Sequence, residues 1–320
     1  MATRRDLMAL SVVALAAATG LGISLTRPFE APLEPPIRSF ASTSETQLWD
    51  LLNAEFGPAD APTIPAAFAE VVRGDAQRGR ELYEVQCLHC HGADGYADTY
   101  TARLLTPKPR DFHLGVVKFT TTASDAPPRQ EDLERTLERG LEPTAMSSFA
   151  NLEAEQRTDL AAYVMNLLIR GAVFEDARVR LEQQSPADAL AQAVALETKR
   201  WTEAAAASID PPARPQLQAA DAGLKLFQSS KAGCFVCHGN DGRGLFTQDT
   251  PALSLLDMWG EASAPRDLRE GPLLGGENAT DLYWRISSGI KGTPMPPMED
   301  LLSPEEIWSL VSLVQSWRAE

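Results

Sequence analysis

All four cysteines of the chain lie in two five-residue motifs, and a histidine directly follows each cysteine pair. The motifs read Cys-Leu-His-Cys-His at residues 87–91 and Cys-Phe-Val-Cys-His at residues 234–238. Two cysteines three positions apart on a helical turn can form thioethers with the vinyl groups on one edge of a porphyrin, and the imidazole that follows then lies under the iron. The spacing therefore predicts two covalently attached haem c groups. The predicted attachment and proximal residues are Cys87, Cys90, His91, Cys234, Cys237 and His238.

Two other uses of paired cysteines fit these residues less well. A redox-active Cys-x-x-Cys needs no histidine directly after it, yet a histidine follows both pairs. A zinc site of cysteine and histidine would have to draw on both motifs, which lie far apart in the chain. Because no cysteine remains outside the motifs, an enzyme that uses a further cysteine as a haem ligand is also disfavoured.

The segments around the two motifs repeat each other block by block. Each motif is followed by Pro-Arg-Asp, at residues 109–111 and 265–267, then by a loop that contains a methionine, and then by a segment with helical apolar periodicity. Blocks that recur in the same order indicate two copies of one domain. We place these domains at residues 75–171 and 219–320.

The remaining segments precede or connect the two domains. Residues 172–218 include an alanine-rich stretch with Ser185 as N-cap and Pro186 at the first helical position, which predicts a helical linker; it either packs on a domain or serves as an exposed spacer. Residues 28–74 are predicted to form a proline-rich tether and a short helix capped at Ser44. No segment alternates with a period of two, so the predicted fold class is all-α.

The iron of a low-spin electron carrier needs a second axial ligand, and few side chains can supply it. Met146 in Thr-Ala-Met-Ser-Ser and Met295 in Thr-Pro-Met-Pro-Pro hold matched places in the two copies. We therefore predict Met146 and Met295 as the distal ligands. Met298 has no counterpart and is predicted to line the edge of the second haem. His113 is the other candidate for the first iron, and contact with a haem propionate or with solvent is the alternative for its imidazole.

The repeated Pro-Arg-Asp motif has two interpretations. A guanidinium group matches a planar carboxylate, so Arg110 and Arg266 are predicted to bind haem propionates. The alternative is that each motif forms only an Arg–Asp turn at the surface.

The N-terminal residues and the net charge bear on location and partners. Arg4 and Arg5 precede residues 7–25, which carry no charge. A segment of this length predicts a membrane anchor over residues 1–27, with a cleaved signal peptide as the alternative. The basic flank then places the domains on the periplasmic side of a bacterial cytoplasmic membrane. The net charge of −15, from 44 acidic and 29 basic residues, disfavours nucleic-acid binding and favours redox partners with basic docking faces.

Taken together, these motifs resemble tandem class I cytochrome c domains, and in particular a membrane-anchored dihaem cytochrome c. The resemblance rests on the two Cys-x-x-Cys-His motifs, the Gly-Thr-Pro-Met-Pro loop, the Leu-Ser-Pro-Glu-Glu-Ile helix start, and Gly79 and Gly223 before the two motifs. It implies that each glycine-bearing helix crosses the last helix of its domain against an aromatic residue. In the first domain this residue would be Tyr163, and in the second Trp308 or Trp317.

The family implies electron transfer without substrate chemistry. We therefore expect a relay of single electrons between a membrane or periplasmic oxidoreductase and an acceptor in a respiratory or related chain, as a subunit of a membrane complex or as its tethered partner. Because prolines flank Met295 and not Met146, the two haems are expected to differ in potential. The alternative is a dihaem peroxidase. Such an enzyme needs an open distal position and an acid–base group, for which His113 is the only free imidazole.

Overall fold

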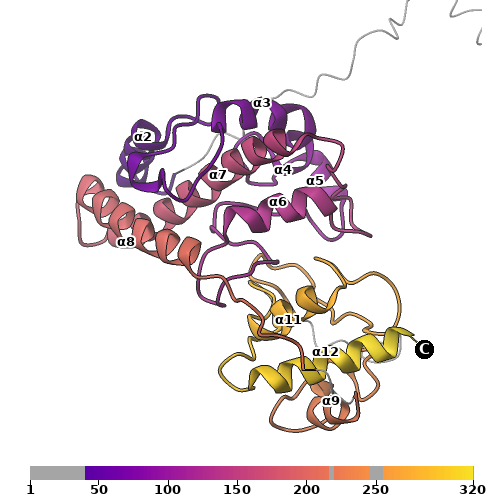
Figure 1. The fold of residues 1–320 in the computed structure, drawn as a ribbon. Coiled ribbons are helices and arrows are strands. Elements are labelled where there is room, and N and C mark those ends of the chain that lie inside the picture. Colours follow the sequence, from indigo (N-terminus) through magenta and orange to yellow (C-terminus); the bar gives the residue numbers. More distant parts are fainter. Residues whose placement is uncertain (1–39, 216–219, 245–254, 320) are drawn as a thin grey trace, which may run out of the picture. The chain divides into compact units, whose positions relative to one another are not determined.

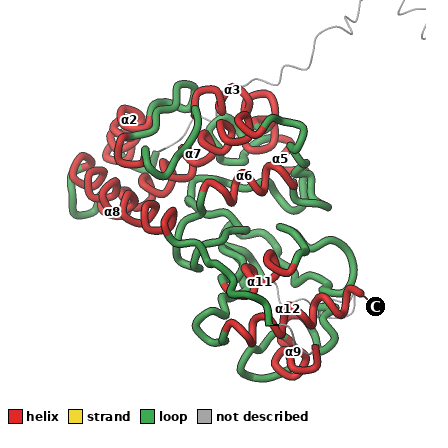
Figure 2. The backbone as a smooth tube through the Cα atoms, viewed as in Figure 1, coloured by secondary structure: helices red, strands yellow, loops and turns green. Residues whose placement is uncertain are grey.

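The computed structural model describes residues 40–215, 220–244 and 255–319, and these residues are helical or in loops almost throughout (Figure 2). The described part of the chain contains no strand beyond one isolated bridge between Leu256 and Ala262. The prediction of a mostly helical protein is therefore confirmed for this part. The predicted anchor at residues 1–27 lies outside the described residues. Among the helices that are described, none is long and apolar enough to span a bilayer.

The first lobe consists of helices that come from residues 43–180 (Figure 1). The short helix predicted near Ser44 is present, although it begins two residues earlier, because Ser42 and not Ser44 is the N-cap and accepts from the backbone N–H of Glu45. The helical elements of this lobe before the predicted linker helix are α2 (Thr43–Phe56), η1 (Ala66–Phe68), α3 (Ala76–Gln86), α4 (Leu88–His91), α5 (Tyr100–Leu104), α6 (Gln130–Arg139) and α7 (Ala154–Arg180).

Helices α3 and α7 cross at a point where one residue has no side chain. A Cβ atom added to Gly79 would lie 1.9 Å from the carbonyl oxygen of Asp159, so only glycine allows this approach. Beside the crossing, the rings of Tyr83 and Tyr163 meet edge to face with centroids 4.9 Å apart. The crossing is the arrangement that the family resemblance implies for the first domain.

The predicted linker helix belongs to the core of the first lobe. Helix α8 (Pro186–Ala206) begins as expected, with the Ser185 side chain accepting from the backbone N–H of Asp188 and proline at N1. It packs on α2 and α7 and buries Trp201, whose Nε1–H donates to Glu197. An exposed spacer would bury no such residue, so the segment is a structural part of the lobe.

The second lobe repeats the crossing with different residues. Its helices are α9 (Ala220–Phe227), α10 (Phe235–His238), α11 (Ala279–Ser287) and α12 (Pro304–Ala319). A Cβ atom on Gly223 would lie 2.2 Å from the carbonyl oxygen of Ser309 on α12. Trp317 meets Phe227 edge to face at 5.1 Å, whereas Trp308 packs on Tyr283. Of the two tryptophans that the resemblance offers, Trp317 therefore takes the place beside the crossing.

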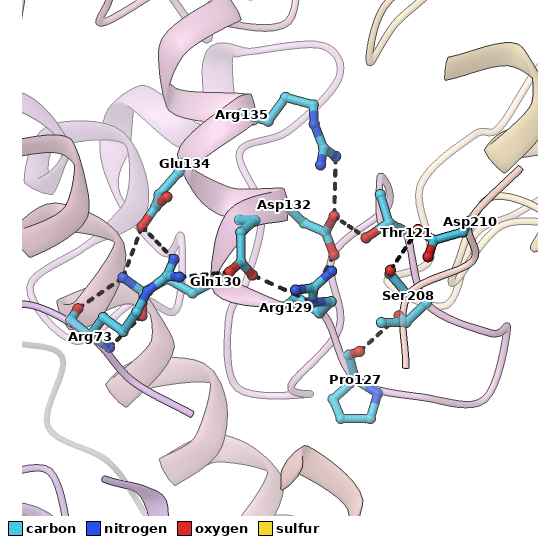
Figure 3. Close-up of polar contacts among 12 residues, drawn as sticks. Arg73, Thr121, Pro127, Arg129, Gln130, Asp132, Glu134, Arg135, Ser208 and Asp210 are labelled. Carbon is cyan, nitrogen blue, oxygen red and sulfur yellow. Dashed lines mark hydrogen bonds and ion pairs between the residues drawn. The ribbon is translucent and has the colours of Figure 1, made fainter. Parts of the chain in front are cut away.

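Each lobe has its own hydrophobic core, and polar contacts join the lobes along a surface that we call the seam. The described residues of both lobes belong to one compact unit. On the first-lobe side of the seam, Asp132 on α6 accepts from Thr121 Oγ1 and pairs with Arg135, which fixes the preceding loop (Figure 3). That loop in turn receives Lys291 from the second lobe, whose Nζ donates to Thr122 Oγ1 at 2.8 Å.

Candidate haem sites

Each Cys-x-x-Cys-His motif forms one helical turn, α4 or α10. The backbone N–H of His91 donates to the carbonyl of Cys87 at 2.9 Å, and His238 bonds Cys234 in the same way at 2.9 Å. Gly92 and Gly239 end these turns with φ of 78° and 70°. None of the four cysteines forms a disulfide. The turns therefore have the local geometry that two thioether bonds and one axial imidazole require.

The surroundings of the thiols argue against a redox dithiol. Burial raises the pKa of Cys87 to about 12 and that of Cys234 to about 11. A disulfide oxidoreductase needs a cysteine whose pKa is lowered, because the thiolate is the nucleophile. A zinc site is disfavoured as well, since the described ranges contain no group of three or more His, Cys, Asp or Glu side chains that could hold a metal.

The imidazoles of the two predicted proximal histidines are oriented by backbone carbonyls of the Pro-Arg-Asp motifs. His91 Nδ1 lies 3.0 Å from the carbonyl oxygen of Arg110, and His238 Nδ1 lies 3.2 Å from that of Arg266. Because a carbonyl can only accept, each Nδ1 carries the hydrogen and each Nε2 keeps its lone pair for a metal. Burial lowers the pKa of both histidines, which favours this neutral form. The sequence pattern alone did not reveal this role of the two arginine carbonyls.

The side chains of the Pro-Arg-Asp motifs make other contacts than the arginine carbonyls, which orient the imidazoles. The carboxylates of Asp111 and Asp267 accept from the backbone N–H two residues later, both at 2.8 Å, so each motif does form an Asp-stabilised turn. Arg266 is exposed, whereas the Arg110 guanidinium stacks on Trp259 of the second lobe at 3.4 Å from the ring centroid. Both arginines line the cavity described below, and propionate binding by their side chains stays a prediction.

The two methionine loops have the same backbone hydrogen bonds in spite of their different prolines. The Met146 carbonyl accepts from Leu141 at 2.9 Å, and the Met295 carbonyl accepts from Ile290 at 3.2 Å. In both loops the methionine N–H donates to a threonine hydroxyl two residues earlier, at 3.1 and 3.2 Å. The first loop is therefore held by the same bonds as the second, and the absence of flanking prolines does not leave Met146 without support.

A single cavity of 1340 Å³ connects the two motifs and the two methionine loops. Its volume exceeds the roughly 300–1000 Å³ of one small-molecule site, which leaves room for two cofactors. The lining is mainly apolar, as a porphyrin requires, and the residues therefore fit two haems. The lining includes every predicted attachment and axial residue, namely Cys87, Cys90, His91, Met146, Cys234, Cys237, His238 and Met295, and also Met298.

The other two histidines lie differently. His113 does not line the cavity, and its Nδ1 lies 2.7 Å from the Asp111 carboxylate. His89 lines the cavity edge and is exposed. Met146 thus reaches the first site and His113 does not, so neither axial ligation by His113 nor acid–base work by it gains support.

Two tandem helical domains, each with a Cys-x-x-Cys-His turn facing an apolar cavity, define a c-type haem protein. Comparison with family models agrees: residues 76–168 match the cytochrome c model, and residues 218–314 match the model of cytochrome c oxidase, cbb3-type, subunit III. The chain belongs to the cytochrome c family and is a dihaem cytochrome c with two covalently bound haem c groups. Its activity is that of an electron-transfer cytochrome.

Two relatives illustrate the likeness. A chain of the reducing HAO-like protein complex of Kuenenia stuttgartiensis is 31% identical with a TM-score of 0.58, and the match covers 75% of this chain and 96% of that one. The cbb3-type cytochrome c oxidase subunit FixP of Sinorhizobium medicae is 34% identical over 107 residues, which are 32% of each chain. The chain thus spans about a third of the length of FixP.

Proposed function

We propose that the chain relays single electrons through two six-coordinate haems and carries out no substrate chemistry of its own. One observation supports this most directly: each Cys-x-x-Cys-His turn shares its cavity with a methionine in a matched loop, Met146 or Met295. Axial His and Met ligands leave no open position on the iron. A peroxidase needs such a position and an acid–base group beside it, and His113 does not line the cavity.

The residues of the chain act by holding ligands in place. When bound, the haem supplies a one-electron couple at its iron. The carbonyls of Arg110 and Arg266 fix the tautomer of the two imidazoles. The hydrogen-bonded loops hold the thioether side chains of Met146 and Met295 in position. No bond forms or breaks in the protein during transfer, so a rigid ligand set in an apolar cavity is what the task requires.

The two haems should have different potentials. The His91 ring stacks on Phe112 with centroids 4.9 Å apart, whereas the matched residue of the second domain is Leu268. Aromatic and aliphatic neighbours differ in polarity and in how closely they cover the ligand, which are properties that tune a haem potential. The difference between Phe112 and Leu268, rather than the prolines around Met295, is therefore our physical reason to expect two different haem potentials.

Spectroscopy of the purified, haem-loaded full chain tests the proposal. We expect both haems to be low-spin in the ferric and ferrous states, a methionine–iron charge-transfer band, and a redox titration that needs two one-electron components. A high-spin haem together with turnover of hydrogen peroxide would show a peroxidase instead. A titration that fits a single midpoint would contradict the proposed difference between the haems.

We further propose that the chain works as a subunit or tethered partner of a membrane oxidoreductase complex, on the periplasmic side of a bacterial membrane. Both relatives are named as parts of larger assemblies, an HAO-like protein complex and an oxidase. The likeness to the first covers more of the chain, which favours an HAO-like partner. The acidic charge of −15 suits a partner with a basic docking face.

Affinity purification of a C-terminally tagged chain from solubilised membranes of its source tests the partner. We expect an oxidoreductase to co-purify at low salt and to be released as ionic strength rises, since exposed charges are screened. Recovery of the chain alone in the soluble periplasmic fraction would overturn the membrane assignment.

A further inference from the structure

A second, smaller cavity borders the haem cavity at the seam. Its volume is 380 Å³, and three basic side chains of the first lobe line both cavities: Lys108, Arg110 and Lys118. The second lobe closes it with residues 257–262, which we call the seam loop. The seam loop is thus placed beside the segment whose Arg110 carbonyl holds the proximal His91.

The seam loop forms direct ion pairs with two of the three cations and none with the third. Lys118 pairs with Asp257 at 2.9 Å, and Lys108 pairs with Glu261 at 2.8 Å. The Arg110 guanidinium has no carboxylate partner and no hydrogen-bond acceptor within the described residues. Burial lowers its pKa to about 10, against the opposing effect of the Asp257 and Asp111 carboxylates. A partly buried guanidinium of this kind is suited to a planar carboxylate.

The residue stacked on Arg110 also lacks an acceptor. Within the described part of the chain, the buried Nε1–H of Trp259 has no hydrogen-bond partner. A buried donor without an acceptor loses the hydrogen bond that it made to water in the unfolded chain, so native structures rarely keep one.

Trp259 is held firmly in this position. Asp257 Oδ1 accepts from the backbone N–H groups of Trp259 and Glu261, at 3.1 and 3.0 Å. On the other side, a Cβ atom on Gly292 would lie 2.5 Å from the indole ring. The indole ring is therefore fixed, and its unpaired N–H cannot turn towards another acceptor.

We propose that a carboxylate of the first haem accepts hydrogen bonds from Trp259 Nε1 and from Arg110, so that the second lobe completes the haem site of the first. Arg110 lines both the haem cavity and the smaller cavity, and Trp259, which stacks on it from the opposite lobe, lines the smaller one. The inference rests on the proposed haem ligation by His91 and Met146, and it assigns a positioning role to a residue outside that domain.

The test compares two tryptophan variants in the haem-loaded full chain. Trp259→Phe keeps the ring against Arg110 and removes only the N–H. Trp284→Phe is the matched control, because Trp284 also stacks on an arginine across the seam, Arg135 at 4.8 Å. It lines neither cavity, and its N–H already donates to the Ile209 carbonyl at 2.7 Å.

Redox titration and resonance Raman spectroscopy give the readouts. Loss of a donor leaves more negative charge on the carboxylate, which favours the ferric state. We expect Trp259→Phe to lower the reduction equilibrium constant of the first haem about threefold, or about 30 mV for one electron at 59 mV per tenfold. The propionate bending band should shift as well. A Met146→His variant, which displaces the potential of the first haem strongly, identifies its component in the titration.

The outcomes separate this inference from the proposed function. Trp284→Phe should leave both readouts unchanged, and Arg110→Lys should shift the first haem in the same direction as Trp259→Phe. If Trp259→Phe and Arg110→Lys leave the first haem unchanged, or if Trp284→Phe shifts it equally, the inference is wrong while the dihaem relay stands. If the wild-type chain shows no low-spin haem in the first lobe, the proposed function itself fails.

Discussion

The buried lysine of the seam gives the protein a pH-dependent stability that one substitution should remove. Lys291 is 8% exposed, and its ammonium group donates to Thr122 Oγ1 and to the Ala126 carbonyl of the other lobe. Burial lowers its pKa from 10.5 to about 8. Since one pKa unit corresponds to 1.36 kcal/mol, burying the charged form costs about 3 kcal/mol relative to the neutral form.

The sign of the effect follows from proton binding. Below pH 8 the lysine is charged in both the folded and the unfolded state, and the cost is present in full. Between pH 8 and about 10.5 the unfolded state binds more protons than the folded state, so the free energy of unfolding rises with pH. Lys291→Met removes the titrating group and should flatten this rise.

Urea unfolding of the haem-loaded chain at several pH values between 7 and 10.5 measures the effect. Lys231→Met is the control, because Lys231 forms an exposed pair with Glu306 in the same lobe. Its unfolding curve should keep the pH dependence of the wild type. The reasoning is refuted if Lys291→Met and the wild type rise in parallel, or if Lys231→Met is as flat as Lys291→Met.

Three further outcomes follow from the sites and the helix crossings. Met295→Ala should leave the second haem attached but shift it towards high spin, whereas Met298→Ala should leave it low-spin; optical spectra decide, and the reverse pattern would exchange the roles of the two residues. Gly79→Ala should lower the free energy of unfolding by about 1–3 kcal/mol, as overpacking does, while Val85→Ala, at a 73% exposed site on the same helix, should not; thermal unfolding compares them. Cys234→Ala should weaken covalent attachment of the second haem only, which intact-protein mass spectrometry after haem extraction detects.

Sequence patterns predicted the parts of the sites that depend on local spacing. A Cys-x-x-Cys-His turn needs only five adjacent residues, and the repeat then gave Met146 and Met295 equivalent places in the two copies. The structure lines one cavity with all of these side chains. The start of the linker helix could also be predicted from the sequence, because Ser185 is a typical N-cap and Pro186 a typical first helical residue.

Features that depend on backbone atoms or on the other lobe left no comparable signal. The Arg110 carbonyl orients His91, but every residue has a carbonyl, so the sequence does not point to this role. The sequence instead suggested a role for the arginine side chain, namely binding of a haem propionate. Trp259 and Lys291 have no equivalents in the first copy, and their partners lie in the other lobe. Alignment of the two copies shows which positions are equivalent, but it carries no information about contacts between the copies.

The same kind of ion pair, between a buried aspartate and an arginine, occurs within the first domain and across the seam. Asp132 and Asp281 occupy the same position, the third residue of α6 and of α11, and both carboxylates are buried. Asp132 pairs within its own lobe, with Arg135, whereas Asp281 pairs across the seam with Arg139 at 2.9 Å. Both helices lead directly into the methionine loops. The ion pair between Arg139 and Asp281 therefore joins the two helices that lead into the loops of the proposed axial ligands.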